Sequence, residues 1–119
     1  MKKLTVMGLF FMSLLGCGKS FNESHTEALQ KVEQGAMLID VRSEAEYREG
    51  HLEGSTRITH TDILKGVQAM GIAKNTPLVL YCRSGNRSGQ ATTALQNAGY
   101  TAVTNGGAYS SLVAASQPK

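Results

Sequence analysis

The segment around Cys82 combines the residue types that a reactive thiol requires. Cys82 ends the apolar run 78–81, and a polar loop reaching to Arg87 separates it from a stretch of helix-forming residues. Backbone N–H groups at the start of such a helix are free donors, and the helix dipole adds partial positive charge. Arg83 and Arg87 add full charges, and Gly85 lets the loop curl so that its N–H groups converge on one anion. These surroundings favour the thiolate, which is the nucleophilic form of cysteine.

Cys82 could instead be an ordinary core residue at the end of a strand, because free cysteine is among the most buried residue types. Two arginines and a glycine within the next five residues are poor material for a core, so we favour the reactive interpretation. The two cysteines and three histidines do not have metal-site spacing, and no metal is predicted. Dithiol chemistry is not expected, because Cys17, the other cysteine, lies in a segment with the features of an export signal.

Alternating helical and apolar segments predict the elements that position this loop. Strands are predicted at residues 37–41, 55–59, 78–81 and 102–104. Helices are predicted at residues 25–34, 44–49, 62–70, 88–97 and from 108 onward. Ser24 and Ser43 each precede a glutamate by three residues, as in a capping box, and Gly106 and Gly107 predict a turn. The alternation predicts an α/β fold whose parallel sheet carries helices on both faces, and ligands of such folds bind beyond the carboxyl ends of the strands.

The first twenty residues have the features of an export signal and not of a folded segment. Two lysines precede the apolar stretch 4–15, which is shorter than the roughly 20 residues of a membrane-spanning helix. Leu-Leu-Gly before Cys17 resembles a bacterial lipobox, and ordinary signal cleavage after Gly18 is the alternative. Both interpretations predict that the mature protein is exported across the inner membrane and is a periplasmic or cell-envelope protein. The predicted division is a lipoprotein signal peptide at 1–16, a linker at 17–23 with Cys17 as the mature N-terminus, and a domain at 24–119.

The composition is that of one globular domain. The chain has 119 residues, of which 41% are hydrophobic and 18% charged, and this excludes a disordered chain and a tandem-domain enzyme. The formal charge of +3 includes Lys2 and Lys3, so the remainder of the chain is nearly neutral and no nucleic-acid partner is predicted. We expect contact with a membrane through the lipid anchor only. The composition does not indicate an oligomeric state.

Four blocks of sequence, in order along the chain, together resemble a known family. Residues 38–42 read Leu-Ile-Asp-Val-Arg, residues 50–55 read Gly-His-Leu-Glu-Gly-Ser, residues 81–88 read Tyr-Cys-Arg-Ser-Gly-Asn-Arg-Ser, and a Gly-Gly pair stands at 106–107. These blocks are similar to the Asp-Val-Arg stretch, the Gly-His turn, the active-site loop and the Gly-Gly turn of the single-domain rhodaneses. Rhodaneses are thiosulfate sulfurtransferases, and the resemblance extends from about residue 24 to residue 116.

The resemblance implies a fold, a reaction and a set of site residues. A rhodanese-like fold implies a central parallel sheet of four to five strands with helices on both faces. By resemblance, Cys82 is the catalytic nucleophile: it takes sulfane sulfur from thiosulfate or a similar small anion as a persulfide, then passes it to cyanide or a thiol. The resemblance assigns binding of the donor and of the persulfide to Arg83, Ser84, Gly85, Asn86, Arg87 and Ser88. No cofactor is implied, because sulfur itself carries the chemistry.

Other residues of the matching blocks are expected to support the site. Asp40 and Arg42 match the family's pattern and are interpreted as structural residues that pin neighbouring loops. His51 matches a turn residue and is not expected to act as a base, because sulfur transfer needs none. Glu53 stands where the family usually has proline, and Tyr109 stands near a usual tryptophan.

Two other functions use the same residue types. A phosphatase or arsenate reductase also combines cysteine, converging N–H groups and arginine, but its arginine follows the cysteine by six residues. Arg87 follows Cys82 by five, and this shorter loop suits a sulfur atom better than a phosphate. A persulfide carrier or sulfur-binding module without efficient turnover stays open. A persulfide adduct without turnover on any acceptor would favour that alternative.

Overall fold

The computed structural model describes residues 23–116. The predicted signal peptide, the lipidation of Cys17 and all of the predicted linker except Glu23 therefore lie outside the described residues. In chain order the elements are α2 (Glu23–Glu33), β2 (Met37–Asp40), α3 (Glu44–Glu49), β3 (Thr56–Arg57), the 3₁₀ turn η2 (His60–Asp62), α4 (Ile63–Ala69), β4 (Leu78–Cys82), α5 (Asn86–Asn97), β5 (Val103–Ala108) and α6 (Tyr109–Ser116).

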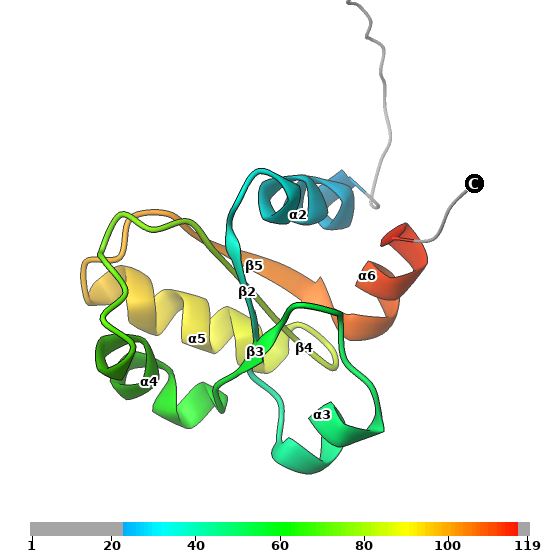
Figure 1. Ribbon diagram of the computed structural model, residues 1–119, viewed down its shortest axis with the longest axis horizontal. Helices are drawn as coiled ribbons and strands as arrows, with labels where there is room; N and C mark the ends of the chain where they lie inside the picture. Colours follow the sequence, from blue (N-terminus) through cyan, green and yellow to red (C-terminus); the bar gives the residue numbers. More distant parts are fainter. Residues whose placement is uncertain (1–22, 117–119) are drawn as a thin grey trace, which may run out of the picture.

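The four strands form one parallel sheet in the order β3-β2-β4-β5 (Figure 1). The prediction of an α/β fold with a parallel sheet of four to five strands is confirmed. The strand ending in Cys82 lies in the interior of the sheet, between β2 and β5. All five residues of β4 are buried, as expected for a parallel strand covered on both faces.

Two clusters of buried side chains lie on opposite faces of the sheet and attach the helices to it. Alternate residues of β4 divide between them, since successive side chains of a strand point to opposite faces. Leu78, Leu80 and Cys82 pack with residues of α4 and α5, whereas Val79 and Tyr81 pack with residues of α2 and α6. Figure 1 shows the same arrangement, with α2 and α6 on one side of the sheet and α4 and α5 on the other.

Several predicted boundaries differ from the structure. Helix α2 begins at Glu23, so Ser24 lies inside the helix and not at its cap, and Glu23 does not belong to the linker. β3 spans only Thr56–Arg57 rather than residues 55–59, because it is an edge strand that pairs on one side alone. Helix α5 begins two residues earlier than predicted, at Asn86. Helix ends shift by one or two residues because the terminal turns have fewer intrahelical hydrogen bonds to fix them.

The Gly-Gly pair near the carboxyl end lies within β5 and does not form the predicted turn before the last helix. The register between β4 and β5 shifts so that Leu80 pairs with Asn105 and Tyr81 pairs with Gly107. Gly106 is left over as a bulge. A Cβ at this position would lie 2.9 Å from Cγ1 of Val79, so the backbone of Gly106 lies closer to β4 than a residue with a side chain allows.

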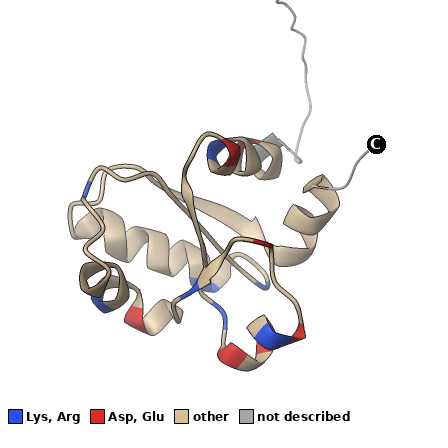
Figure 2. Ribbon diagram, in the orientation of Figure 1, with Lys and Arg blue, Asp and Glu red and all other residues tan. Residues whose placement is uncertain are grey.

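Charged residues gather around α3 and the neighbouring loops, whereas β5 and α6 carry none (Figure 2). Within residues 23–116, no helix has both the length and the apolar composition needed to cross a bilayer. The same part of the chain contains no group of three or more histidine, cysteine, aspartate or glutamate side chains arranged to hold a metal ion.

Candidate active site

Three groups that can donate a hydrogen bond lie within reach of the sulfur of Cys82 at the carboxyl end of β4. The Gly85 N–H donates to Sγ over 3.0 Å and the Ser88 N–H over 3.4 Å, while Ser88 Oγ lies 3.5 Å from the same sulfur. Cys82 and Ser88 are both fully buried. The loop and the first turn of α5 therefore converge on one sulfur atom, as the loop composition predicts.

Gly85 gives this loop its shape. It is the N-cap residue of α5, with φ of 95°, and no side chain caps the helix. A residue with a side chain rarely adopts this left-handed conformation. A Cβ at Gly85 would also lie 3.3 Å from the Cα of Gly107 on β5. The glycine thus lets the chain turn tightly against β5, and because it has no side chain to accept the Ser88 N–H, that group donates to Cys82.

Two opposing effects act on the thiol of Cys82. Burial raises its pKa, but hydrogen bonds from the side chain and backbone of Ser88 and from the N–H groups of Gly85 and Ser84 lower it. The hydrogen bonds prevail, and the pKa of Cys82 lies below its ordinary value. Hydrogen bonds to the charged form of a group favour that form. The site therefore increases the thiolate fraction of a cysteine that has been removed from water.

Arg87 forms a two-point ion pair with Glu46 of α3. Nη1 lies 3.0 Å from Oε1, and Nη2 lies 3.1 Å from Oε2. The hydrogen bond from Arg87 lowers the pKa of Glu46 to about 2. The same bond raises the pKa of Arg87, and Cys82 contributes in the same direction. The guanidinium predicted to bind the donor is thus held by a carboxylate beside the sulfur, and its role toward substrate stays a prediction.

Asp40 and Arg42 form a buried ion pair at the end of β2. Nη2 of Arg42 lies 2.7 Å from Oδ2 of Asp40 and donates a second bond of 2.6 Å to the carbonyl of Gly50. Hydrogen bonding to Asp40 raises the pKa of Arg42, and burial opposes this effect. The pair connects the strand end to the loop that follows α3. This arrangement is the one expected of residues that pin loops, although their role as structural residues stays a prediction.

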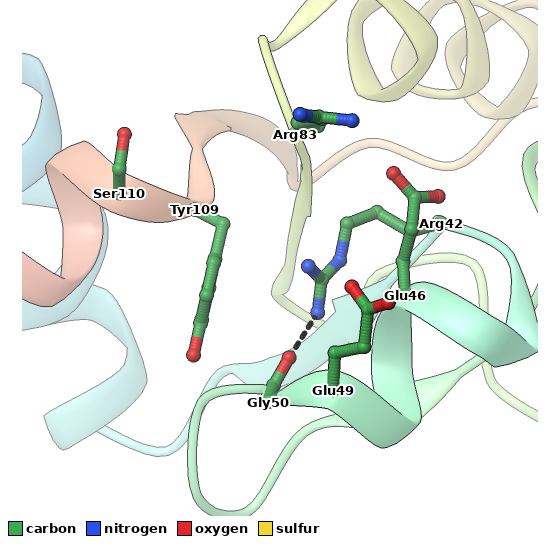
Figure 3. Close-up of a pocket in the computed structure, with 7 residues that line it drawn as sticks. All are labelled: Arg42, Glu46, Glu49, Gly50, Arg83, Tyr109 and Ser110. Atoms are coloured by element: carbon green, nitrogen blue, oxygen red, sulfur yellow. Dashed lines mark hydrogen bonds between the residues drawn. The ribbon is translucent and has the colours of Figure 1, made fainter.

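A pocket of about 460 Å³ opens beside the loop that follows Cys82. In Figure 3, Glu46 and Glu49 project into it from α3 and Tyr109 faces Arg42 across it. The guanidinium carbon of Arg42 lies 4.4 Å from the centre of the Tyr109 ring, a cation–π contact. The pocket is lined by Arg42, Glu46, Glu49, Gly50, Arg83, Tyr109 and Ser110. Arg83, the residue after Cys82, is exposed at its rim and forms no ion pair among the described residues.

Ser84 and Asn86 of the loop, and His51 of the matching turn, lie near the site without a described side-chain contact to Cys82. Ser84 is exposed, and its Oγ accepts a bond of 3.4 Å from the Asn86 N–H. Asn86 is the first residue of α5 and is exposed. His51 is exposed and stacks on Tyr47, with Nδ1 2.8 Å from the Tyr47 carbonyl. None of these three side chains has a hydrogen bond to Cys82 among the described contacts.

Three residues near the site were not found by sequence reasoning. Glu46 holds Arg87, although its capping-box position had marked it only as a helix start. Asn105 contacts Ser88 through a bond of 2.7 Å between Oδ1 and Oγ, and nothing local to the sequence indicates this contact. The Tyr81 hydroxyl donates to Ser55 Oγ over 3.0 Å and accepts from the Leu52 N–H over 3.0 Å, so it anchors the loop after α3. The sequence did contain one signal for Tyr81, which is its position directly before Cys82 in a predicted buried strand.

A single activated thiol at the carboxyl end of a parallel sheet defines a class of proteins that use a cysteine nucleophile for group transfer. The family model of the rhodanese-like domain matches residues 24–110. The chain belongs to this rhodanese-like family.

Individual relatives agree with this membership. The thiosulfate sulfurtransferase PspE of Escherichia coli K12 is 35% identical over 69 residues, which are 58% of this chain and 66% of that protein. The thiosulfate sulfurtransferase GlpE of Pseudomonas fluorescens SBW25 is 29% identical over 85 residues, 71% of this chain and 74% of that protein. A rhodanese from E. coli solved with anions superposes with a TM-score of 0.62 at 32% identity, covering 71% of this chain and 95% of that one. The human single-domain sulfurtransferase TSTD1 gives a TM-score of 0.62 at 27% identity, covering 77% and 93%.

Proposed function

We propose that this protein is a thiosulfate sulfurtransferase that works through a persulfide on Cys82. In the first step the thiolate attacks the outer sulfur of thiosulfate. A bond forms between Sγ and that sulfur, the S–S bond of the donor breaks, and sulfite leaves with the electron pair. In the second step cyanide or a thiolate attacks the outer sulfur of the persulfide and regenerates the Cys82 thiolate. This is covalent catalysis in two half-reactions.

The observation that carries the proposal is the convergence of donors on Cys82 Sγ. Bonds from Gly85, from the Ser88 N–H and from the Ser88 hydroxyl group would stabilise both the attacking thiolate and the persulfide anion. The two backbone donors, the N–H groups of Gly85 and Ser88, need no rearrangement when charge develops, because the chain already holds them in place. Membership of the rhodanese-like family and the names of the relatives support the same reaction.

Charge near the loop supports a dianionic donor. Arg83 is exposed at the rim of the pocket and follows Cys82 directly, so its fork of N–H groups can meet the sulfonate oxygens of thiosulfate. Arg87 carries its charge beside the sulfur, and its ion pair with Glu46 fixes its position. In this proposal Arg83 binds the donor and Arg87 supplies a fixed positive field that favours departure of sulfite.

Steady-state kinetics with thiosulfate and cyanide tests the proposal. Wild type should show ping-pong behaviour, since each substrate reacts with a different form of the enzyme. The Cys82→Ser variant should show no turnover while keeping a native circular dichroism spectrum, because a serine oxygen cannot form a persulfide. Turnover near the wild-type rate in folded Cys82→Ser would overturn the mechanism. Persulfide formation without turnover on any acceptor would indicate a sulfur carrier.

The proposal includes export to the cell envelope, with membrane contact through a lipid on Cys17 only. Its support is the order of charged, apolar and small residues before Cys17. Cells fed labelled palmitate should label the wild-type protein and should not label Cys17→Ala. An unlabelled, soluble wild-type protein whose N-terminus is Lys19 would contradict lipidation and favour ordinary cleavage after Gly18.

A further inference from the structure

The hydroxyl group of Ser88 lies between two groups that can accept its one hydrogen. Its Oγ is 2.7 Å from Oδ1 of Asn105 on β5 and 3.5 Å from Sγ of Cys82. A serine hydroxyl donates a single hydrogen bond. It therefore cannot donate to both groups at once, and the shorter distance belongs to Asn105.

Two further contacts fix which way the Asn105 amide points. The Gly107 N–H donates to Oδ1 over 3.0 Å, and Nδ2 donates to the carbonyl of Gly85 over 3.2 Å. Exchanging the amide oxygen and nitrogen would place donor against donor and acceptor against acceptor. Oδ1 therefore faces Ser88. Because a carbonyl oxygen only accepts, the Ser88 hydroxyl is the donor, and one of its lone pairs is left to face the sulfur.

This arrangement suits a neutral thiol better than an anion. The S–H group of Cys82 can donate to the Ser88 lone pair, whereas a thiolate or a persulfide anion requires the hydroxyl hydrogen. We propose that Asn105 is a positioning residue that holds the Ser88 hydroxyl hydrogen away from the Cys82 sulfur while the sulfur is neutral and releases it when the sulfur becomes an anion. Release is favourable because a charged acceptor forms the stronger hydrogen bond.

The strand geometry explains how Asn105 reaches this position. The register of β4 and β5 shifts directly after Asn105, with Gly106 left over as the bulge. Bulges change the direction of a neighbouring side chain and are common beside active sites. Asn105 thereby contacts the Cys82 loop at two points, the hydroxyl group of Ser88 and the carbonyl of Gly85.

The charged surroundings of the sulfur do not depend on Asn105. Arg87 of α5 is the charged residue that interacts with Cys82, and its partner Glu46 belongs to α3. Arg83 of the loop is exposed at the pocket. From β5 and α6 no charged side chain faces the site, since neither element contains one. From α2 the titratable side chain of His25 lies against Gly107, and the substitution leaves it unchanged in both backgrounds. A change at Asn105 therefore reports on hydrogen bonding and leaves these charges in place.

The test is the pH dependence of Cys82 alkylation in an Asn105→Leu variant of the full-length protein. Asn105 is itself exposed, whereas Ser88 behind it is fully buried. Leucine is close to asparagine in size, so it continues to cover Ser88 but offers no acceptor. The Ser88 hydroxyl then has the sulfur as its remaining acceptor, and the thiolate fraction at a pH below the pKa should rise about fivefold, the equivalent of one ordinary hydrogen bond. Iodoacetamide labelling is read from the mass of the peptide containing Cys82, so that Cys17 does not contribute.

The same substitution in a Ser88→Ala background is the control. It removes the same contacts with Gly85 and Gly107 but acts on a site without the hydroxyl group, so it measures any loosening of the loop. We expect the fivefold rise only when Ser88 is present. An equal change in both backgrounds would show that Asn105 acts through the loop alone and would overturn the proposal.

An Asn105→Asp variant keeps the experiment decisive if Asn105→Leu does not fold. The carboxylate holds the hydroxyl hydrogen more strongly than the amide, so the thiolate fraction should fall more in the wild-type background than in the Ser88→Ala background. Equal falls would overturn the proposal. The inference rests on the proposed function only in taking the thiolate as the reactive form. Alkylation does not require a sulfur donor, so a failure to form persulfide would be seen separately.

Discussion

Two loops of this protein lead from a buried strand into a helix at the same edge of the sheet, and they use the first N–H groups of that helix differently. After β2, Ser43 caps α3, and its Oγ accepts the Glu46 N–H over 3.3 Å. After β4, the cap is Gly85, and the Ser88 N–H donates to the sulfur of Cys82 over 3.4 Å. Glu46 and Ser88 occupy the same position, three residues after the cap.

The difference explains why the loop after β2 has a structural role and the loop after β4 can carry a reactive thiol. The loop after β2 satisfies its donors with its own side chains and neutralises Arg42 with Asp40. At the loop after β4 the cap residue has no side chain, so the N–H groups of Gly85 and Ser88 remain available for a negative charge on Cys82. With a glycine cap in place of a serine cap, the N–H group three residues after the cap donates to the sulfur of Cys82 and not to the cap residue.

The largest expected effect is on stability, in the loop after β2. Arg42→Met should lower the free energy of unfolding by about 3–5 kcal/mol, because it leaves the Asp40 carboxylate buried without its partner. Denaturant unfolding measures this. Arg48→Met is the matched control, since Arg48 pairs with Glu44 on the exposed face of α3 and should cost at most about 1 kcal/mol. Equal losses in the two variants would contradict the division between scaffold and surface pairs.

The next effect is on activity, in the loop after β4. Gly85→Asn would place a capping side chain where none exists, and its carbonyl would compete with Cys82 for the Ser88 N–H. We expect thiosulfate:cyanide turnover to fall about 10–100-fold, as for the loss of one hydrogen bond to a charged group. Gly85→Ala has no competing acceptor and at least as much backbone strain, since alanine adopts a positive φ less readily than asparagine, and it should nevertheless lose less activity. If both variants lose the same activity, strain and not capping determines the effect.

The smallest expected effect is the pH dependence of the ion pair that joins the two loops. Arg87 lowers the pKa of Glu46 from 4.5 to about 2. The pair therefore stabilises the fold fully above pH 4.5 and loses its contribution as the pH falls toward about 2. Because both side chains are partly exposed, the contribution should not exceed about 1 kcal/mol.

Melting temperatures measured from neutral pH to about pH 2 test this. Wild type should be more stable than Glu46→Gln at neutral pH, and the difference should disappear on acidification. Glu44→Gln alters the exposed pair with Arg48 and should show little difference at any pH. A wild-type advantage over Glu46→Gln that stays constant with pH would contradict the role of the Glu46 carboxylate.

The part of the site that could be predicted from the sequence is local. Cys82, the glycine of its loop and the start of α5 lie within a few residues of each other, so residue types and helix-end chemistry were sufficient. The Ser43 capping box was likewise predicted and is confirmed. The apolar run before Cys82 indicated a buried parallel strand, which the structure confirms.

The parts that were missed depend on how distant segments meet. The Arg87–Glu46 pair joins residues 41 positions apart, and nothing in either segment selects the partner. The contact between Ser88 and Asn105 depends on a register shift between β4 and β5, and a sequence pattern does not contain strand register across a bulge. The same bulge accommodates the Gly-Gly pair within β5, where a turn was predicted.

The most direct test of the account is the mass of the Cys82 peptide after the full-length protein has reacted with thiosulfate and before any acceptor is added. Wild type should gain the mass of one sulfur atom on Cys82, and cyanide should remove that sulfur as thiocyanate. The folded Cys82→Ser variant should gain nothing. A folded wild-type protein that shows no sulfur adduct, or a Cys82→Ser variant that still produces thiocyanate, would contradict the claim that the loop after β4 is built to carry a persulfide.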